Sequence, residues 1–281
     1  MAHKKDGRVM TEPGANFKRG TVEAGGFTLD YAEAGPANPK ATIVSLPGSA
    51  GLEMSTAKDE LARTYRVVEV NPPGWGGKSD VDRTISQAEL GAILAQAAAK
   101  LVAGKYYLIG TSMGGANALY AAKVAPDKIL GIVLEGSMAP ARLEDLHRPP
   151  PTAEQRQGMA MATEDAGFKY PTPPAHPNKP WATPDFVAGQ MKNRFRMFRW
   201  VETEFSAGDA IDVVKTHNIP VLALLGEEDQ ILKTSQKDAY KAVLPHAQYQ
   251  TIPGAEHDIQ NSQPDAIVRS VDAFVRLTRG V

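Results

Sequence analysis

The sequence predicts an α/β fold in which helices flank a mostly parallel β-sheet that one inserted segment interrupts. Short apolar runs alternate with helical stretches along most of the chain, and strands buried on both faces between helices are typical of βαβ units. One proline-rich stretch breaks this alternation. The chain has 281 residues, of which 42% are hydrophobic and 22% charged, so it is long enough for one large core and an insertion.

Local patterns predict the individual strands and helices, in chain order. Thr28–Ala32 alternates apolar and polar residues, as a half-buried strand does. Ser86–Val102 is a predicted helix that opens with a capping box of Ser86 and Glu89. A late strand at Ala247–Ile252 precedes a terminal helix. The strands expected to be buried on both faces are Ala41–Leu46, Arg66–Val70, Tyr106–Ile109, Ile129–Leu134 and Val221–Leu225.

The proline-rich stretch from Ser137 to Asp185 holds ten of the 21 prolines, so it cannot form regular sheet or a long helix. A helical pattern follows it, and the strand pattern resumes at Val221. We therefore predict a lid inserted between two consecutive strands. The expected division is a polar tail at 1–20, the first part of the core at 21–136, the lid (cap) at 137–216 and the second part of the core at 217–281.

Composition argues against several classes of protein. Lys and Arg number 31 against 32 Asp and Glu, a net charge of −1, so bulk charge favours neither nucleic acid nor an anionic membrane. The absence of cysteine excludes disulfides, thiolate zinc sites and a cysteine nucleophile. We find no secretory signal pattern and no apolar run of membrane-spanning length. We expect a cytoplasmic protein with no metal and no cofactor.

The segment Gly110-Thr111-Ser112-Met113-Gly114-Gly115 lies between a predicted strand and the helical stretch Ala116–Val124. A strand-to-helix turn tight enough to present a serine hydroxyl leaves no room for side chains two residues to either side of the serine. Glycine stands at both of those positions. The pattern therefore predicts a nucleophilic serine at position 112.

With this G-x-S-x-G motif, the chain resembles the α/β-hydrolase superfamily from about Gly26 to its C-terminus. The resemblance implies the order serine, acid, histidine along the chain. His257, which ends Pro253-Gly254-Ala255-Glu256-His257, matches the family's catalytic-histidine loop. Two carboxylates compete for the role of the acid. Asp229, in a G-x-x-D loop after a strand, is favoured over Glu135, which resembles the alternative position used by some haloalkane dehalogenases.

The resemblance also implies an oxyanion hole, which needs two backbone N–H groups. One would come from Met113, and the other from Ser49 in the loop Pro47-Gly48-Ser49-Ala50-Gly51. Trp75 lies in a segment that is similar to a family loop approaching the active site. The lid aromatics Phe195 and Phe198 would contribute to an apolar substrate pocket.

The family resemblance implies a serine hydrolase that cleaves a carboxylic ester through an acyl-enzyme. Trp181–Val187 is similar to a segment of serine-dependent C–C hydrolases that cleave ring-fission diketones, although Gln190 stands where those enzymes usually carry arginine. A third hypothesis is a ligand-sensing protein that keeps the scaffold without turnover. We expect a small-molecule ester or other acyl compound as the binding partner, and neither nucleic acid nor a membrane. The sequence leaves a homodimer open.

Overall fold

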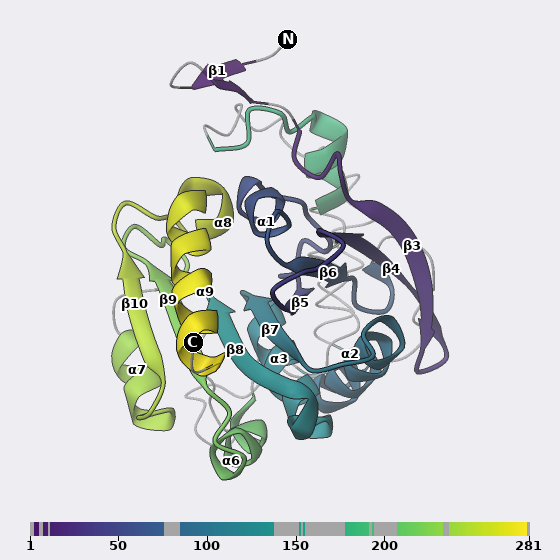
Figure 1. Cartoon of the computed structure of the whole chain (residues 1–281), viewed down its shortest axis with the longest axis vertical. Coiled ribbons are helices and arrows are strands. Elements are labelled where there is room, and N and C mark those ends of the chain that lie inside the picture. The colour runs from purple at the N-terminus through teal and green to yellow at the C-terminus, as the bar shows by residue number, and fades with distance from the viewer. Residues whose placement is uncertain are drawn as a thin grey trace.

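An eight-stranded sheet forms the centre of the molecule in the computed structural model (Figure 1). The two antiparallel pairs, β3 with β4 and β4 with β6, lie at one edge, and the remaining neighbours are parallel. In order across the sheet, the strands are β10 (Gln248–Ile252), β9 (Val221–Gly226), β8 (Ile129–Glu135), β7 (Tyr106–Thr111), β5 (Thr42–Leu46), β6 (Arg66–Val70), β4 (Phe27–Ala34) and β3 (Lys18–Ala24).

The structure describes residues 3–5, 8–10, 12–75, 85–137, 152, 154, 178–190, 193, 207–232 and 236–279. A separate antiparallel pair, β1 (His3–Lys5) and β2 (Arg8–Met10), lies apart from the sheet near the N-terminus (Figure 1). Most of the predicted lid falls outside the described residues. None of the helices in the described ranges combines the length and the apolar character that a bilayer-spanning helix needs.

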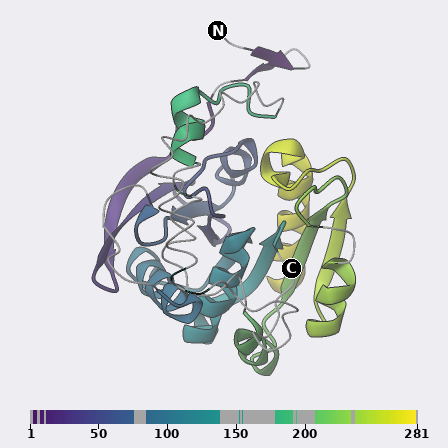
Figure 2. The same ribbon diagram turned by 180° about the vertical axis from the view of Figure 1, so that it is seen from behind.

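Helices cover both faces of the sheet, and Figure 2 shows the molecule from behind. On one face lie α1 (Thr56–Leu61), α8 (Ile259–Ser262) and α9 (Pro264–Arg279). On the other face lie α2 (Gln87–Leu101), α3 (Met113–Val124), α6 (Gly208–Thr216) and α7 (Gln236–Val243). A short 3-10 helix, η2 (Pro126–Lys128), leads into β8. The predicted α/β fold with a mostly parallel, helix-flanked sheet is confirmed.

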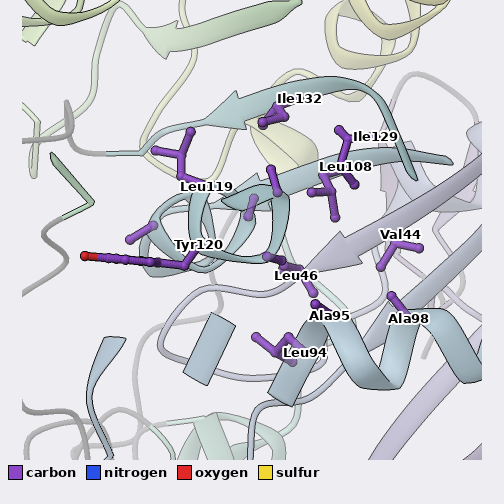
Figure 3. Packing of buried hydrophobic residues seen from close by; sticks show 14 of the residues in the cluster. Val44, Leu46, Leu94, Ala95, Ala98, Leu108, Leu119, Tyr120, Ile129 and Ile132 are labelled. Carbon is purple, nitrogen blue, oxygen red and sulfur yellow. The ribbon is translucent and has the colours of Figure 1, made fainter. Parts of the chain in front are cut away.

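Two apolar cores, one on each face of the sheet, hold the helices in place. Along β7, Tyr106 and Leu108 belong to one core, whereas Tyr107 and Ile109 belong to the other. This alternation follows from the two-residue period of a strand, and burying a leucine or isoleucine contributes about 1.5–3 kcal/mol. Figure 3 shows part of the first core, in which Leu108 lies among residues from neighbouring strands and from α2 and α3.

The predicted strands all occur, with ends that differ by a residue or two. Ser86 caps α2 as the sequence indicates, because its Oγ accepts a hydrogen bond of 3.1 Å from the Glu89 amide. Strand β3 already begins at Lys18, within the range expected to be a tail. Helix α6 falls within the predicted lid range 137–216, yet it packs against α3 and contributes Ile211 and Val214 to the core.

Candidate active site

The chemically interesting side chains gather at one edge of the sheet because the carboxyl ends of its parallel strands meet there. Ser112 follows β7, Glu135 ends β8, Asp229 follows β9 and His257 follows β10. The loop after β5, which contains Ser49, lies at the same edge. In open α/β sheets, this edge is where ligands bind.

The turn at Ser112 has the geometry of a nucleophile elbow. Ser112 has a φ of 51° and a ψ of −117°, a conformation that costs a non-glycine residue on the order of 1–3 kcal/mol. A Cβ on Gly110 would lie 2.3 Å from the Gly114 carbonyl oxygen, and one on Gly114 would lie 2.0 Å from the Leu46 carbonyl oxygen. Both positions therefore require glycine. The Ser112 amide donates to the Glu135 carbonyl at 2.9 Å, which ties the elbow to β8.

Three of the predicted residues form a continuous hydrogen-bonded chain. His257 Nε2 lies 3.1 Å from Ser112 Oγ, and His257 Nδ1 lies 2.8 Å from Asp229 Oδ2. The other carboxylate oxygen of Asp229 accepts hydrogen bonds of 2.8 Å from the amides of Ile231 and Leu232. The Asp229 side chain is 1% exposed. The imidazole can therefore take a proton from the serine hydroxyl while the carboxylate holds its ring orientation.

Glu135, the alternative acid, lies in a different environment. Its side chain is buried and accepts hydrogen bonds of 2.8 Å from Thr111 Oγ1 on one oxygen and from the Gln260 amide on the other. Burial, and then the nearby charge of Asp258, raises the pKa of the Glu135 carboxyl to about 7. Among the described residues, Asp229 is the carboxylate that contacts the His257 ring.

The two expected oxyanion donors lie on segments that approach each other closely. Met113 is the first residue of α3, where a backbone N–H has no acceptor within the helix. The loop containing Ser49 passes beside the elbow, since a Cβ on Gly48 would lie 3.2 Å from the Ser112 Cβ. Trp75 also holds this loop, because its indole N–H donates to the Ser49 carbonyl at 2.9 Å.

A cavity of about 260 Å³ opens beside Ser112 and His257. Trp75, which we expected in the substrate pocket, is 2% exposed and does not line this cavity. The expected pocket residues Phe195 and Phe198 lie outside the described residues. The described lining consists of Pro47, Gly48, Ser49, Ala50, Gly51, Glu53, Lys58, Glu69, Thr111, Ser112, Lys179, Ile231, His257, Asp258 and Gln260. A larger cavity of about 860 Å³ lies beside α1, and its described lining does not include Ser112, Asp229 or His257.

The cavity wall carries a group of charged side chains that sequence reasoning missed: Glu53, Lys58, Glu69, Lys179 and Asp258. They come from the segment after β5, from α1, from β6, from the predicted lid and from the position after His257. No motif joins residues so far apart in the chain. In the sequence, only the position of Asp258 directly after His257 could have indicated that this charged group lies at the site.

The strand order and the serine elbow after β7 define the class of protein, which is an α/β hydrolase. The chain belongs to the family described as alpha/beta hydrolase fold, which matches residues 44–264.

Curated relatives and solved structures agree with this membership. The chain is 24% identical over 270 residues to 2-hydroxy-6-oxo-6-(2'-aminophenyl)hexa-2,4-dienoic acid hydrolase of Metapseudomonas resinovorans, covering 89% of this chain and 91% of that protein. It is 31% identical over 134 residues, 46% of each chain, to 2-hydroxy-6-oxononadienedioate/2-hydroxy-6-oxononatrienedioate hydrolase of Burkholderia vietnamiensis (strain G4 / LMG 22486). A thermophilic esterase from Thermogutta terrifontis shares the fold with a TM-score of 0.69 and 19% identity, over 93% of this chain and 99% of that one.

Proposed function

We propose that this α/β hydrolase is a serine hydrolase that cleaves a carboxylic ester. The observation that carries the proposal is the position of His257, whose two ring nitrogens lie at hydrogen-bonding distance from Ser112 Oγ and from Asp229 Oδ2. A general base between a hydroxyl nucleophile and a buried carboxylate is the arrangement that activates serine at neutral pH.

In the proposed reaction, Ser112 Oγ attacks the ester carbonyl carbon while its proton passes to His257 Nε2. The amides of Ser49 and Met113 stabilise the negative charge on the carbonyl oxygen. The tetrahedral intermediate collapses, the C–O bond to the alcohol breaks, and His257 returns the proton to the departing alkoxide. Water, deprotonated by His257, then attacks the acyl-enzyme, which releases the carboxylic acid and restores Ser112.

The Ser112→Ala variant tests this proposal, with p-nitrophenyl esters of increasing acyl length as substrates. We expect kcat to fall by about 1,000-fold or more, because the variant lacks the nucleophile of the triad. The melting temperature should be unchanged, and a fluorophosphonate probe should not label the variant. Ser270→Ala is the matched control, because the Ser270 hydroxyl on α9 donates to Gln250 Oε1 on β10 and neither residue lines the cavity beside Ser112. Full activity of the Ser112→Ala variant would refute the proposed nucleophile.

C–C bond hydrolysis is the second candidate, and the two curated relatives favour it. One is named as a hydrolase of a 2-hydroxy-6-oxo hexadienoic acid, and the other as a hydrolase of 2-hydroxy-6-oxononadienedioate and 2-hydroxy-6-oxononatrienedioate. The same serine would attack the 6-oxo carbon, the bond between C5 and C6 would break, and His257 would give the proton taken from Ser112 to the departing C5. The purified enzyme should be given a 2-hydroxy-6-oxo dienoic acid and the ester panel side by side. A kcat/KM for the dienoic acid at least 100-fold above that for the best ester would replace the ester assignment with C–C hydrolysis.

A further inference from the structure

The described part of the predicted lid contacts the loops of the candidate active site through three polar side chains. Lys179 Nζ lies 2.6 Å from Glu53 Oε1 and 2.5 Å from Asp258 Oδ2. Gln190 Nε2 donates to the second carboxylate oxygen of Glu53 at 2.5 Å. Asn193 Nδ2 donates to the Ala50 carbonyl at 2.8 Å.

The groups that receive these contacts flank the reacting atoms on two sides. Ala50 directly follows Ser49, the expected oxyanion donor, and Glu53 lies three residues further along the same segment. Asp258 directly follows His257. Lys179 therefore joins the oxyanion side of the cavity to the histidine side, and it lines the same cavity as Ser112.

The loop from Pro47 to Glu53 has few regular hydrogen bonds of its own. The Gly51 amide donates to the Gly48 carbonyl at 3.0 Å, and the Leu52 amide donates to Asn71 Oδ1 at 2.5 Å. The position of the loop therefore depends on groups outside it, among them Asn71 and the side chains of Lys179 and Gln190 that contact the Glu53 carboxylate.

Charge makes the Lys179 contacts strong. Burial lowers the pKa of Lys179, but the charges of Asp258 and Glu53 outweigh that effect and raise it overall, so the ammonium stays charged at neutral pH. Glu53 is only 8% exposed. Removing the cation would leave the two carboxylates with the neutral Asn261 amide, which donates to both, but without the charge that joins them. In a largely buried site this costs more than the loss of a surface ion pair.

A second ion pair fixes the main chain at Glu53. Lys58 Nζ donates to the Glu53 carbonyl at 2.6 Å and pairs with Glu69, whose other oxygen accepts from the Glu53 amide at 3.0 Å. Lys58 and Glu69 thus hold the backbone of Glu53, while its carboxylate contacts Lys179 and Gln190.

We propose that Lys179 and Glu53 are positioning residues, which hold the Ser49 loop and the His257 loop at the separation that catalysis needs. The proposal rests on the proposed serine-hydrolase function. Neither side chain takes part in a bond-making step. They act through the Ser49 amide and the His257 ring, whose interactions with the substrate are strongest in the transition state.

The Lys179→Met variant tests this proposal, because methionine keeps much of the side-chain length and removes the charge. We expect kcat on an activated aryl ester to fall about 10–100-fold, as for a small misplacement of catalytic groups, with KM changed less than about 3-fold. Lys179→Arg, which restores a cation, should recover kcat to within about 3-fold. A purely structural role would lower the melting temperature without this split between kcat and KM.

Lys123→Met is the matched control, because Lys123 on α3 forms an exposed ion pair with Asp209 on α6, and neither residue lines the cavity beside Ser112. It should leave kcat unchanged. If Lys179→Met fails to fold, Glu53→Gln carries the test, since it removes the carboxylate charge that pairs with Lys179 and should also lower kcat. Unchanged kcat in Lys179→Met, or in Glu53→Gln where that variant replaces it, would overturn the proposal.

Glu53→Gln completes the experiment. It should lower kcat by a similar factor. The kcat of the double variant with Lys179→Met should be no lower than that of the less active single variant, because both changes remove the same ion pair. Multiplicative losses would show that the two residues act independently and would contradict the proposal. If Ser112→Ala retains activity, the proposed function itself fails. If Ser112→Ala is inactive and Lys179→Met matches the wild type, only this positioning role fails.

Discussion

The ends of β8 and β9 each carry a carboxylate near the His257 loop, and the two carboxylates have different surroundings. At the end of β8, both oxygens of Glu135 accept hydrogen bonds, from Thr111 Oγ1 and from the Gln260 amide. After β9, two backbone amides bind the same oxygen of Asp229, so the other oxygen is directed to His257 Nδ1.

The difference shows that a carboxylate at a strand end becomes the partner of the histidine only when its other donors leave one oxygen free. The turn at 229–232 supplies two amides to one oxygen of Asp229. At Glu135 the donors come from both sides, and burial raises the carboxyl pKa to about 7. We infer that Asp229 orients the histidine and that Glu135 holds the elbow and the His257 loop together.

Replacement of Asp229 by asparagine should have the largest effect. The amide cannot stabilise the imidazolium, and it favours the wrong ring tautomer, so kcat should fall about 10³–10⁴-fold with little change in KM. Kinetics on the activated ester measure this, with Glu135→Gln as the matched carboxylate-to-amide control. Equal activity of Asp229→Asn and the wild type would contradict this assignment and favour Glu135 as the acid.

Glu135→Gln should change kcat only a few-fold and should instead alter the pH dependence of stability. Because the folded-state pKa of Glu135 is raised from 4.5 to about 7, its contribution to the free energy of unfolding is complete below pH 4.5 and is lost as the pH rises through about 7. The variant should therefore gain up to about 3 kcal/mol relative to the wild type between pH 4.5 and pH 8. Urea unfolding at a series of pH values measures the difference. A pH-independent difference would contradict the raised pKa.

Thr111→Val should have the smallest effect. It removes the hydrogen bond to the Glu135 carboxylate, which costs about 0.5–1.5 kcal/mol of unfolding free energy. Since that bond favours the charged carboxylate and lowers its pKa, its loss should move the pH at which stability declines to a higher value. The same urea series measures the shift. An unmoved midpoint would show that the threonine does not influence Glu135.

Much of the fold was predictable, because strand burial and helix capping are local properties of the chain. The run Tyr106–Ile109 and the glycines at 110 and 114 predict a strand followed by a tight turn, and the structure shows Ser112 at a φ of 51°. The prediction that Trp75 lines the substrate pocket was wrong. Its loop motif indicated that the residue lies near the active site but not where its side chain points, and the indole donates to the Ser49 carbonyl instead of lining the cavity.

The sequence by itself determined the alternation of buried strands and helices, the elbow at Ser112 and the short list of candidate partners for its hydroxyl. These features depend on residue type and spacing within a few positions, where backbone sterics and side-chain periodicity act directly. Only the tertiary structure decided which carboxylate contacts His257 and brought Glu53, Lys179 and Asp258 together at the cavity. Such contacts depend on where distant segments meet and on which donors already occupy each oxygen, and no local pattern specifies either.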